Sequence, residues 1–340
     1  MTKMRRTWMP SILIGLTIIL FMVSPARSQA PFYSGKAITI LIGTSGGGSI
    51  VAARIIAQHI VKYIPGNPAV VVQPMLGGAH IVATNHVFNT AKPDGLTLLA
   101  ANPNIAIAQL IKVDGVRFDV RKFEWLGSSG SDGVVLTVRS DLPYKTFDEL
   151  RKADRELVVG TTGPGSNAHD FPLMLKEFAG VKLRFVSGYP ANSDILLAIE
   201  RKEVDVWAAF AATVRPVVQR GAVRPLVRAR VPSPGFENLP VDESFTTNPV
   251  GKALMAIKTA PLAIGRAVAA PPGTPADRVA LLKDALAKVM KDPELEADGR
   301  KAQIDFGYMS GDEVLKSFTV LLQQPPDVLQ EMVKYIKFGG

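Results

Sequence analysis

The stretch Ala37-Ile38-Thr39-Ile40-Leu41-Ile42-Gly43-Thr44-Ser45-Gly46-Gly47-Gly48-Ser49 passes from an apolar segment into a loop of glycine and hydroxyl residues. A helical pattern begins near Ile50. The same order returns later, where Leu157-Val158-Val159 leads into Gly160-Thr161-Thr162-Gly163-Pro164-Gly165-Ser166-Asn167. A helix that starts this way presents unpartnered N–H groups at the positive end of its dipole, which suits an anion. Two such loops predict two lobes that hold one anionic ligand between them.

Apolar segments and helical patterns alternate along the chain, which predicts an α/β fold with parallel-rich sheets. The expected strands of the first set are 37–42, 69–72 and 96–100, with helices at 50–63 and 81–90. The second set has strands at 157–160, 183–186 and 204–209, with helices at 168–179 and 193–202. The expected closing helices are 276–290, one from residue 293, 312–322 and 327–336.

The β-rich stretches 123–127 and 134–139 have no long helix between them, and the apolar run 266–270 leads back. We therefore expect two crossing strands that join the lobes and act as a hinge. In this division lobe 1 holds residues 30–137 and 264–340, and lobe 2 holds residues 138–263.

The first 28 residues have the pattern of a cleaved secretory signal peptide. Lys3, Arg5 and Arg6 form a basic start, residues 12–23 an apolar core, and Ala26-Arg27-Ser28 a small-residue cleavage site. The apolar core is shorter than the roughly 20 residues that span a bilayer, which disfavours an uncleaved anchor. We expect the mature protein to be free in the periplasm. With no cysteine, its domain must be stable without disulfides.

The formal net charge is +9 from 39 basic and 30 acidic residues, and cleavage after Ser28 removes four basic residues, leaving +5. The remaining basic residues are scattered and are not interleaved with aromatic residues. This pattern predicts a preference for anionic small molecules and no binding of nucleic acid.

One alternative is an exported serine hydrolase, because Gly43-Thr44-Ser45-Gly46-Gly47 satisfies G-x-S-x-G. The nucleophile would be Ser45, but a hydrolase elbow follows several strands, whereas this loop ends the first. Only His59, His80, His86 and His169 are available as a base, and no paired carboxylates suggest acid–base chemistry. The histidines also lack metal-ligand spacing, so we interpret each as a surface or hydrogen-bonded residue, except that His169 begins the second helix. We expect no enzyme, no catalytic residue, no metal and no cofactor.

The chain resembles the substrate-binding proteins of tripartite tricarboxylate transporters, the TctC or Bug type. Besides the two loops, the resemblance is carried by segments spread over the chain: Ala53-Arg54, Pro93-Asp94-Gly95-Leu96-Thr97-Leu98-Leu99, the segment from Phe118 to Ser128, Gly188-Tyr189, Glu203-Val204-Asp205, Pro272-Gly273-Thr274-Pro275 and Lys291-Asp292-Pro293-Glu294-Leu295. It implies a two-lobed, type II-like periplasmic-binding-protein fold that captures an organic carboxylate without chemistry. It also implies delivery to a membrane permease with a large and a small subunit, and we expect a monomer. A sensor that presents its ligand to a signalling partner remains open.

Mapped onto this sequence, the resemblance places the ligand at the ends of several expected strands. The first loop would hold the carboxylate with Thr44, Ser45, Gly46, Gly47, Gly48 and Ser49. Asn102 and Asn104 would line the same lobe. The second lobe would contribute Gly163, Ser166, Asn167, His169, Tyr189 and Phe210.

The chain departs from the family pattern at several of these places. Its Leu76-Gly77-Gly78-Ala79-His80 stands where Pro-Gly-x-Gly-Gly is usual, and Ile50 replaces a common aspartate. The apolar Ile50 and Phe210 are compatible with an aromatic or long aliphatic carboxylate. The sequence leaves the identity of the carboxylate open.

Overall fold

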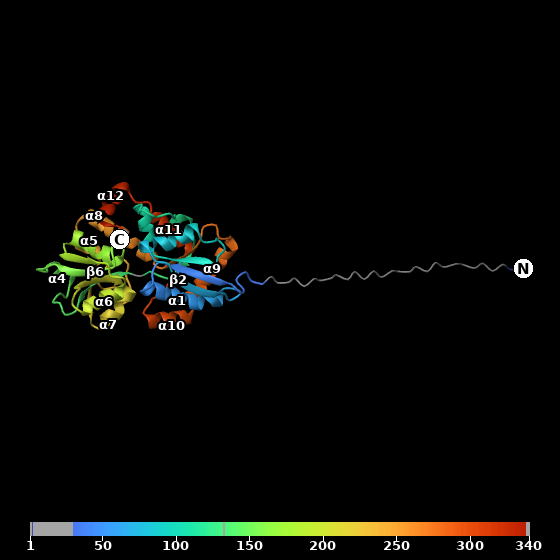
Figure 1. The fold of residues 1–340 in the computed structure, drawn as a ribbon, viewed down its shortest axis with the longest axis horizontal. Helices are drawn as coiled ribbons and strands as arrows, with labels where there is room; N and C mark the ends of the chain where they lie inside the picture. The colour runs from blue at the N-terminus through green and yellow to red at the C-terminus, as the bar shows by residue number, and fades with distance from the viewer. Residues whose placement is uncertain (1, 3–29, 132, 338–340) are drawn as a thin grey trace.

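The computed structural model describes residue 2, residues 30–131 and residues 133–337, which form two α/β lobes side by side (Figure 1). The expected signal peptide, residues 1–28, lies outside the described residues apart from residue 2. Within the described part of the chain, no helix is both long and apolar enough to cross a membrane.

The first sheet has the strand order β11-β4-β10-β3-β1-β2. Its strands are β1 (Ala37–Ile42), β2 (Ala69–Pro74), β3 (Thr97–Ala101), β4 (Glu124–Ser128), β10 (Ala267–Ala270) and β11 (Met309–Ser310). The strand β1 pairs in parallel with β2 and β3, because α-helices cross between them. The strand β10 runs antiparallel to β3 and β4, so this sheet is mixed.

The second sheet has the order β7-β6-β8-β5-β9 and is also mixed. Its strands are β5 (Val134–Arg139), β6 (Leu157–Thr161), β7 (Leu183–Ser187), β8 (Val206–Phe210) and β9 (Val223–Arg228). The strand β5 pairs with β8 and β9 along most of its length. The expected lobe boundary after residue 137 therefore falls inside a strand of the second sheet, and the chain passes from one sheet to the other between the end of β4 and the start of β5.

The helices that sequence patterns predicted are all present. They are α1 (Gly48–Ile60), α2 (Ile81–Asn89), α5 (Asn167–Ala179), α6 (Asn192–Glu200), α9 (Ala276–Val289), α10 (Pro293–Ala302), α11 (Gly311–Leu321) and α12 (Pro326–Tyr335). The described part of the chain has further α-helices that were not predicted, namely α3 (Ile105–Leu110), α4 (Phe147–Arg151), α7 (Ala211–Gln219) and α8 (Pro249–Ile264).

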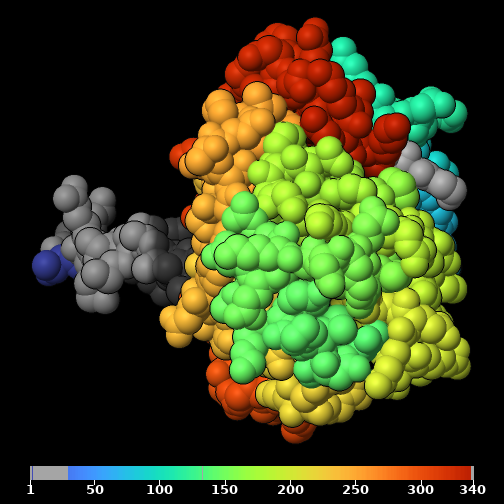
Figure 2. Space-filling view, turned by 90° about the vertical axis from the view of Figure 1, so that its left-hand side faces the viewer, coloured from blue at the N-terminus to red at the C-terminus, as the bar shows by residue number. Residues whose placement is uncertain are grey.

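The two sheets share one continuous cluster of buried side chains. It contains Trp125 of β4 and Phe318 of α11, whose rings lie 4.9 Å apart, together with Val134 of β5 and Leu254 of α8. The helix α8 packs against α11 and α12 and also against α5 of the second lobe. Figure 2 shows the last, red segment of the chain over one end of that lobe, beside the orange α8. The lobes are therefore joined by packing as well as by the connecting segments.

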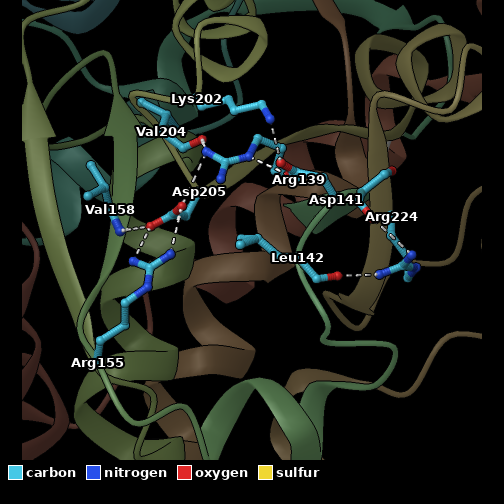
Figure 3. A network of polar contacts seen from close by, with 10 residues as sticks. Arg139, Asp141, Leu142, Arg155, Val158, Lys202, Val204, Asp205 and Arg224 are labelled. Atoms are coloured by element: carbon cyan, nitrogen blue, oxygen red, sulfur yellow. Dashed lines mark hydrogen bonds and ion pairs between the residues drawn. The ribbon is translucent and has the colours of Figure 1, made fainter.

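At one end of the second sheet, Asp205 holds three strands together (Figure 3). Its carboxylate accepts hydrogen bonds from Arg155 at 2.7 and 3.1 Å and from the Val158 N–H at 3.0 Å, and Arg139 lies at 3.3 Å. Burial alone would raise the pKa of Asp205, but these partners outweigh it and the pKa is lowered. The starts of β6 and β8 and the end of β5 are thus fixed together, and their other ends face the cleft.

Candidate functional site

At the first glycine loop, no side chain of the described residues caps the start of α1. Thr44 Oγ1 closes a small turn with Gly46, through hydrogen bonds of 3.0 and 3.3 Å, and Gly47 takes φ 81° at the helix cap. A glycine suits this backbone conformation because a Cβ would be strained there. The first amides of α1 are therefore open to an anion.

The second glycine loop differs from the first, because hydroxyl side chains of the loop already accept hydrogen bonds from backbone N–H groups there. Ser166 Oγ accepts from the His169 N–H at 3.3 Å and donates to the Gly163 oxygen at 2.6 Å, while Thr161 Oγ1 accepts from the Gly163 N–H at 2.8 Å. The start of α5 therefore carries a serine cap. The two loops look alike in sequence, but the serine cap leaves fewer unpartnered N–H groups at the second loop than at the first.

A buried ion pair supports this second loop. Asp170 is fully buried and lies 2.8 Å from Lys258 Nζ of α8 and 3.0 Å from His169 Nδ1, and it accepts from the Gly165 N–H at 3.1 Å. Burial would raise the pKa of Asp170, but the charge of Lys258 and the hydrogen bonds from His169 and Lys258 lower it. His169 is thereby held against Asp170 and the ring of Phe185. This arrangement gives His169 a role in supporting the loop.

A helix that the sequence patterns missed faces the start of α1. The helix α7 begins directly after β8, and its cap, Phe210, provides no side-chain hydrogen bond. A Cβ at Gly48 would lie 3.8 Å from Thr213 Oγ1 and 4.0 Å from the Ala212 Cβ. The start of α7, and not that of α5, is therefore the second uncapped helix end at the start of α1.

Two local features explain why the sequence patterns do not predict α7. No turn residue separates the helix from β8, and Pro216 interrupts its pattern. The one signal that could have revealed it was the hydroxyl of Thr213, placed soon after the end of a strand.

A cavity of about 670 Å³, which includes its open mouth, lies at this junction. Its deeper walls are apolar and come from the first lobe, with Ile40, Ile42, Ala52, Ala53, Ile56 and Val268 among them. Its polar lining residues are Ser49, His80, Asn102, Ser129 and Arg266. Phe210 lines it from the second lobe. Ser49, Asn102 and Phe210 are thus expected site residues that the structure brings together.

The other expected residues lie around this cavity or away from it. Ser45, Gly46 and Gly47 are exposed in the first loop. Asn104 is buried and donates to Asn167 across the cleft at 3.3 Å. Tyr189 packs against the buried cluster of α6 and β8 and does not line the cavity.

Ile50 is also not a lining residue. It is 1% exposed and packs with Ile42 and Ala53 in the core. The presence of Ile50 in place of the usual aspartate therefore gives no direct information about the ligand.

His80 is half-buried, so the expectation of a surface or hydrogen-bonded residue holds only in part. It lines the cavity, and its Nδ1 is buried without a hydrogen-bond partner among the described residues. The ring lies so close to Gly43 that a Cβ there would collide with it. Burial lowers the pKa of His80 to about 4, so its imidazole is neutral at pH 7.

The backbone at His80 explains why spacing did not reveal it. Four consecutive residues have positive φ, from Gly77 at 128° to His80 at 79°, and Ala79 among them is not glycine. Positive φ is uncommon outside glycine, and clustered strain of this kind marks functional sites. The departure from the family pattern at this position was the signal that pointed to it.

The serine hydrolase alternative finds no support. No hydrogen bond among the described residues joins Ser45 to a histidine. His59 instead pairs with Asp298 at 3.0 Å, toward the far end of α1. Among the described residues, no three His, Cys, Asp or Glu side chains are grouped so that they could hold a metal ion.

Comparisons with known proteins agree with this architecture. A family model described as the tripartite tricarboxylate transporter family receptor matches residues 52–333. A UPF0065 protein of Bordetella bronchiseptica is 26% identical over 290 residues, which cover 82% of this chain and 81% of that protein. Another UPF0065 protein, of Cupriavidus necator, is 25% identical over 318 residues and 91% of each chain.

Among solved structures, the periplasmic binding protein BugD superposes with a TM-score of 0.69 at 20% identity, over 89% of this chain and 98% of that one. The Rhodopseudomonas palustris protein Rpa4515, solved with adipate, gives 0.69 at 19% identity over 88% and 98%. MatC of the same species, solved with malate, gives 0.64 at 20% identity over 88% and 98%. These likenesses show the two-lobed periplasmic-binding-protein fold. Since the family model covers most of the sequence, the chain belongs to the tripartite tricarboxylate transporter receptor family.

Proposed function

We propose that this protein captures an organic carboxylate in the periplasm and delivers it to a membrane permease of the tripartite tricarboxylate type. The single observation that carries the proposal is the uncapped start of α1, which opens at a cavity between the lobes and faces the uncapped start of α7. Backbone N–H groups at such an end bind a carboxylate without an arginine clamp. The role is that of a binding protein and not of an enzyme.

The charge around the cavity suits an anion. Arg266 is the only lysine or arginine among the residues that line it, and its Nη2 donates to the Asp305 carbonyl at 2.7 Å. The helix ends add the positive poles of two dipoles. Family members with bound malate and adipate have the same fold, which supports the carboxylate as the ligand class.

The contacts between the lobes support a mechanism of closure around the ligand. Arg215 of α7 binds Asp305 at 2.6 Å and the Gln303 carbonyl at 3.2 Å, while Gln303 Nε2 donates to Gln219 at 2.8 Å. These polar contacts exchange readily with water, unlike the apolar packing of α8. In our proposal they release when the lobes open and re-form around the ligand, and the closed form docks on the permease.

The remaining parts of the proposal follow from the sequence pattern. Residues 1–28 direct export and are cleaved, and the mature chain acts as a monomer with a large and a small permease subunit as partners. A thermal-shift screen of the purified protein against mono-, di- and tricarboxylates tests the central claim. A ligand at about 100 times its Kd adds about 2.7 kcal/mol to the stability, which raises Tm visibly. If no carboxylate raises Tm, even after denaturation and refolding to remove bound ligand, the proposal is wrong.

A further inference from the structure

The cavity extends from the cleft into the first lobe, between α1 and the first sheet. Ser49, Ala52, Ala53 and Ile56 line it from α1, and their spacing places them on one face of that helix. Two of the four are alanines, whose small side chains leave space against the sheet. The strands β1 and β10 form the opposite wall.

A second cavity continues in the same direction. It is narrow, measures about 350 Å³ only when the space open to solvent is counted, and shares Ile40, Ile56 and Val268 with the first cavity. Ile60, the last residue of α1, and Ile64 beyond the end of that helix line its far side. From Ser49 to Ile60 the helix rises about 16 Å, at about 1.5 Å per residue. The two cavities lie next to each other, and the side chains of Ile40, Ile56 and Val268 separate them.

The second cavity has no polar or charged side chain that could bind a charged group. The residues that line the second cavity are all isoleucine, leucine or valine. Apolar cavities stay free of water and accept apolar guests. A second carboxylate placed there would lose its hydration without gaining a hydrogen bond, at a cost of several kcal/mol. A hydrocarbon chain would instead gain free energy with every methylene buried.

We propose that the ligand is a monocarboxylate with an extended hydrocarbon body. Its carboxylate binds at the start of α1 beside Ser49, and its body lies in the first cavity, between α1 and the first sheet, with the tail directed toward Ile40 and Ile56. The inference rests on the proposed carboxylate-binding function and adds the class of carboxylate.

The test is a calorimetric titration of the purified protein, after removal of bound ligand, with linear monocarboxylates of about two to ten carbons. We expect the affinity to rise about threefold to fourfold for each added methylene. Dicarboxylates of the same lengths should bind more weakly, because their second charge cannot enter. Equal affinity across the series, or tighter binding of the dicarboxylates, would overturn the inference and leave carboxylate capture standing. Binding of no carboxylate at all would overturn both.

Two substitutions on α1 test where the hydrocarbon tail of the ligand lies. Ala53 lines the cavity and Ala57 does not, although both are 6% exposed. Ala53→Leu should flatten the dependence of affinity on chain length, and Ala57→Leu should keep it. The same effect from both variants would contradict the placement. Should Ala53→Leu fail to fold, the chain-length series of the unmodified protein still decides the ligand class.

Discussion

Asn104 Nδ2 lies 3.3 Å from Asn167 Oδ1, and this hydrogen bond joins the lobes directly across the cleft. Asn104 occupies the N-cap position of α3 without a side-chain capping hydrogen bond, while Asn167 is the first residue of α5 in the second lobe. The Oδ1 of Asn104 is buried, with no hydrogen-bond partner in the described part of the chain. Two residues that the sequence assigned to opposite walls of the site are therefore in contact in this structure.

The contact predicts that Asn167 favours the closed form. In Asn167→Ala the closed state loses one hydrogen bond, worth about 1 kcal/mol. We expect carboxylate affinity to fall about fivefold, mainly through faster dissociation, as measured by stopped-flow fluorescence. Asn85→Ala is the control, since Asn85 bonds to Gly115 and Arg117 away from the cleft. Equal effects from both variants would speak against a role in closure.

A charge placed in the first loop should prevent carboxylate binding. A Cβ at Gly46 would have no neighbouring atom within 4 Å, and the φ of Gly46 is not positive, so Gly46→Asp adds a carboxylate without backbone strain. Gly47 is less suitable, because its φ of 81° would strain any other residue.

We expect Gly46→Asp to weaken carboxylate binding at least about tenfold, because the introduced charge repels the ligand and competes for the amides. Gly46→Asn has the same size without the charge and should bind nearly as the unmodified protein does. Titration calorimetry measures both. Unchanged carboxylate affinity in Gly46→Asp would show that the binding site does not lie at the start of α1.

His80 should reduce stability in acid. Its pKa of about 4 in the folded protein lies below the ordinary value of 6.5, so the unfolded chain binds the proton first as pH falls. Stability is then lost between about pH 6.5 and pH 4, by about 2 kcal/mol at pH 5.

His80→Asn removes this titration, and asparagine tolerates the positive φ of 79°. The difference in unfolding free energy between the two proteins should shift in favour of the variant from about pH 7.5 to about pH 5, measured by urea denaturation. A difference that does not change with pH would show that His80 is not buried in this way.

We expect Asp242 to change the stability with pH in the opposite direction from His80. Burial, with a further contribution from the charge of Glu243, raises the pKa of Asp242 to about 7, and its Oδ1 has no hydrogen-bond partner among the described residues. The folded state keeps its proton to higher pH than the unfolded chain does, so stability is full below about pH 4 and is lost as pH rises through about 7.

Asp242→Asn should therefore stabilise the protein by on the order of 4 kcal/mol at about pH 8 and by only about 1 kcal/mol at about pH 4.5. Melting curves of both proteins at the two pH values test this. A variant that is less stable than the unmodified protein at the higher pH would contradict the expectation.

The elements that the sequence predicted have strong local signals. The strand β1 lies where the sequence predicts it, because a run of mostly aliphatic and β-branched residues ends at Gly43. The helix α10 is predicted by Asp292-Pro293, where Asp292 caps it. A proline alone does not hide a helix, since α5 was predicted although it contains Pro172. The helix α7 also follows β8 without a turn residue between them, and both missed helices, α7 and α8, contain a proline, Pro216 and Pro261. Tertiary packing stabilises both in spite of it.

The sequence by itself determined the alternating α/β pattern, the position of the first glycine loop between a strand and a helix, and the family of the chain, since these depend on residues adjacent in sequence. Only the tertiary structure decided that Ser166 caps the second loop, that α7 faces α1, and that His80 enters the cavity. The physical reason is that capping, burial and strain depend on which side chains meet in space. Local patterns predict where a helix begins, but not whether its first amides are already occupied.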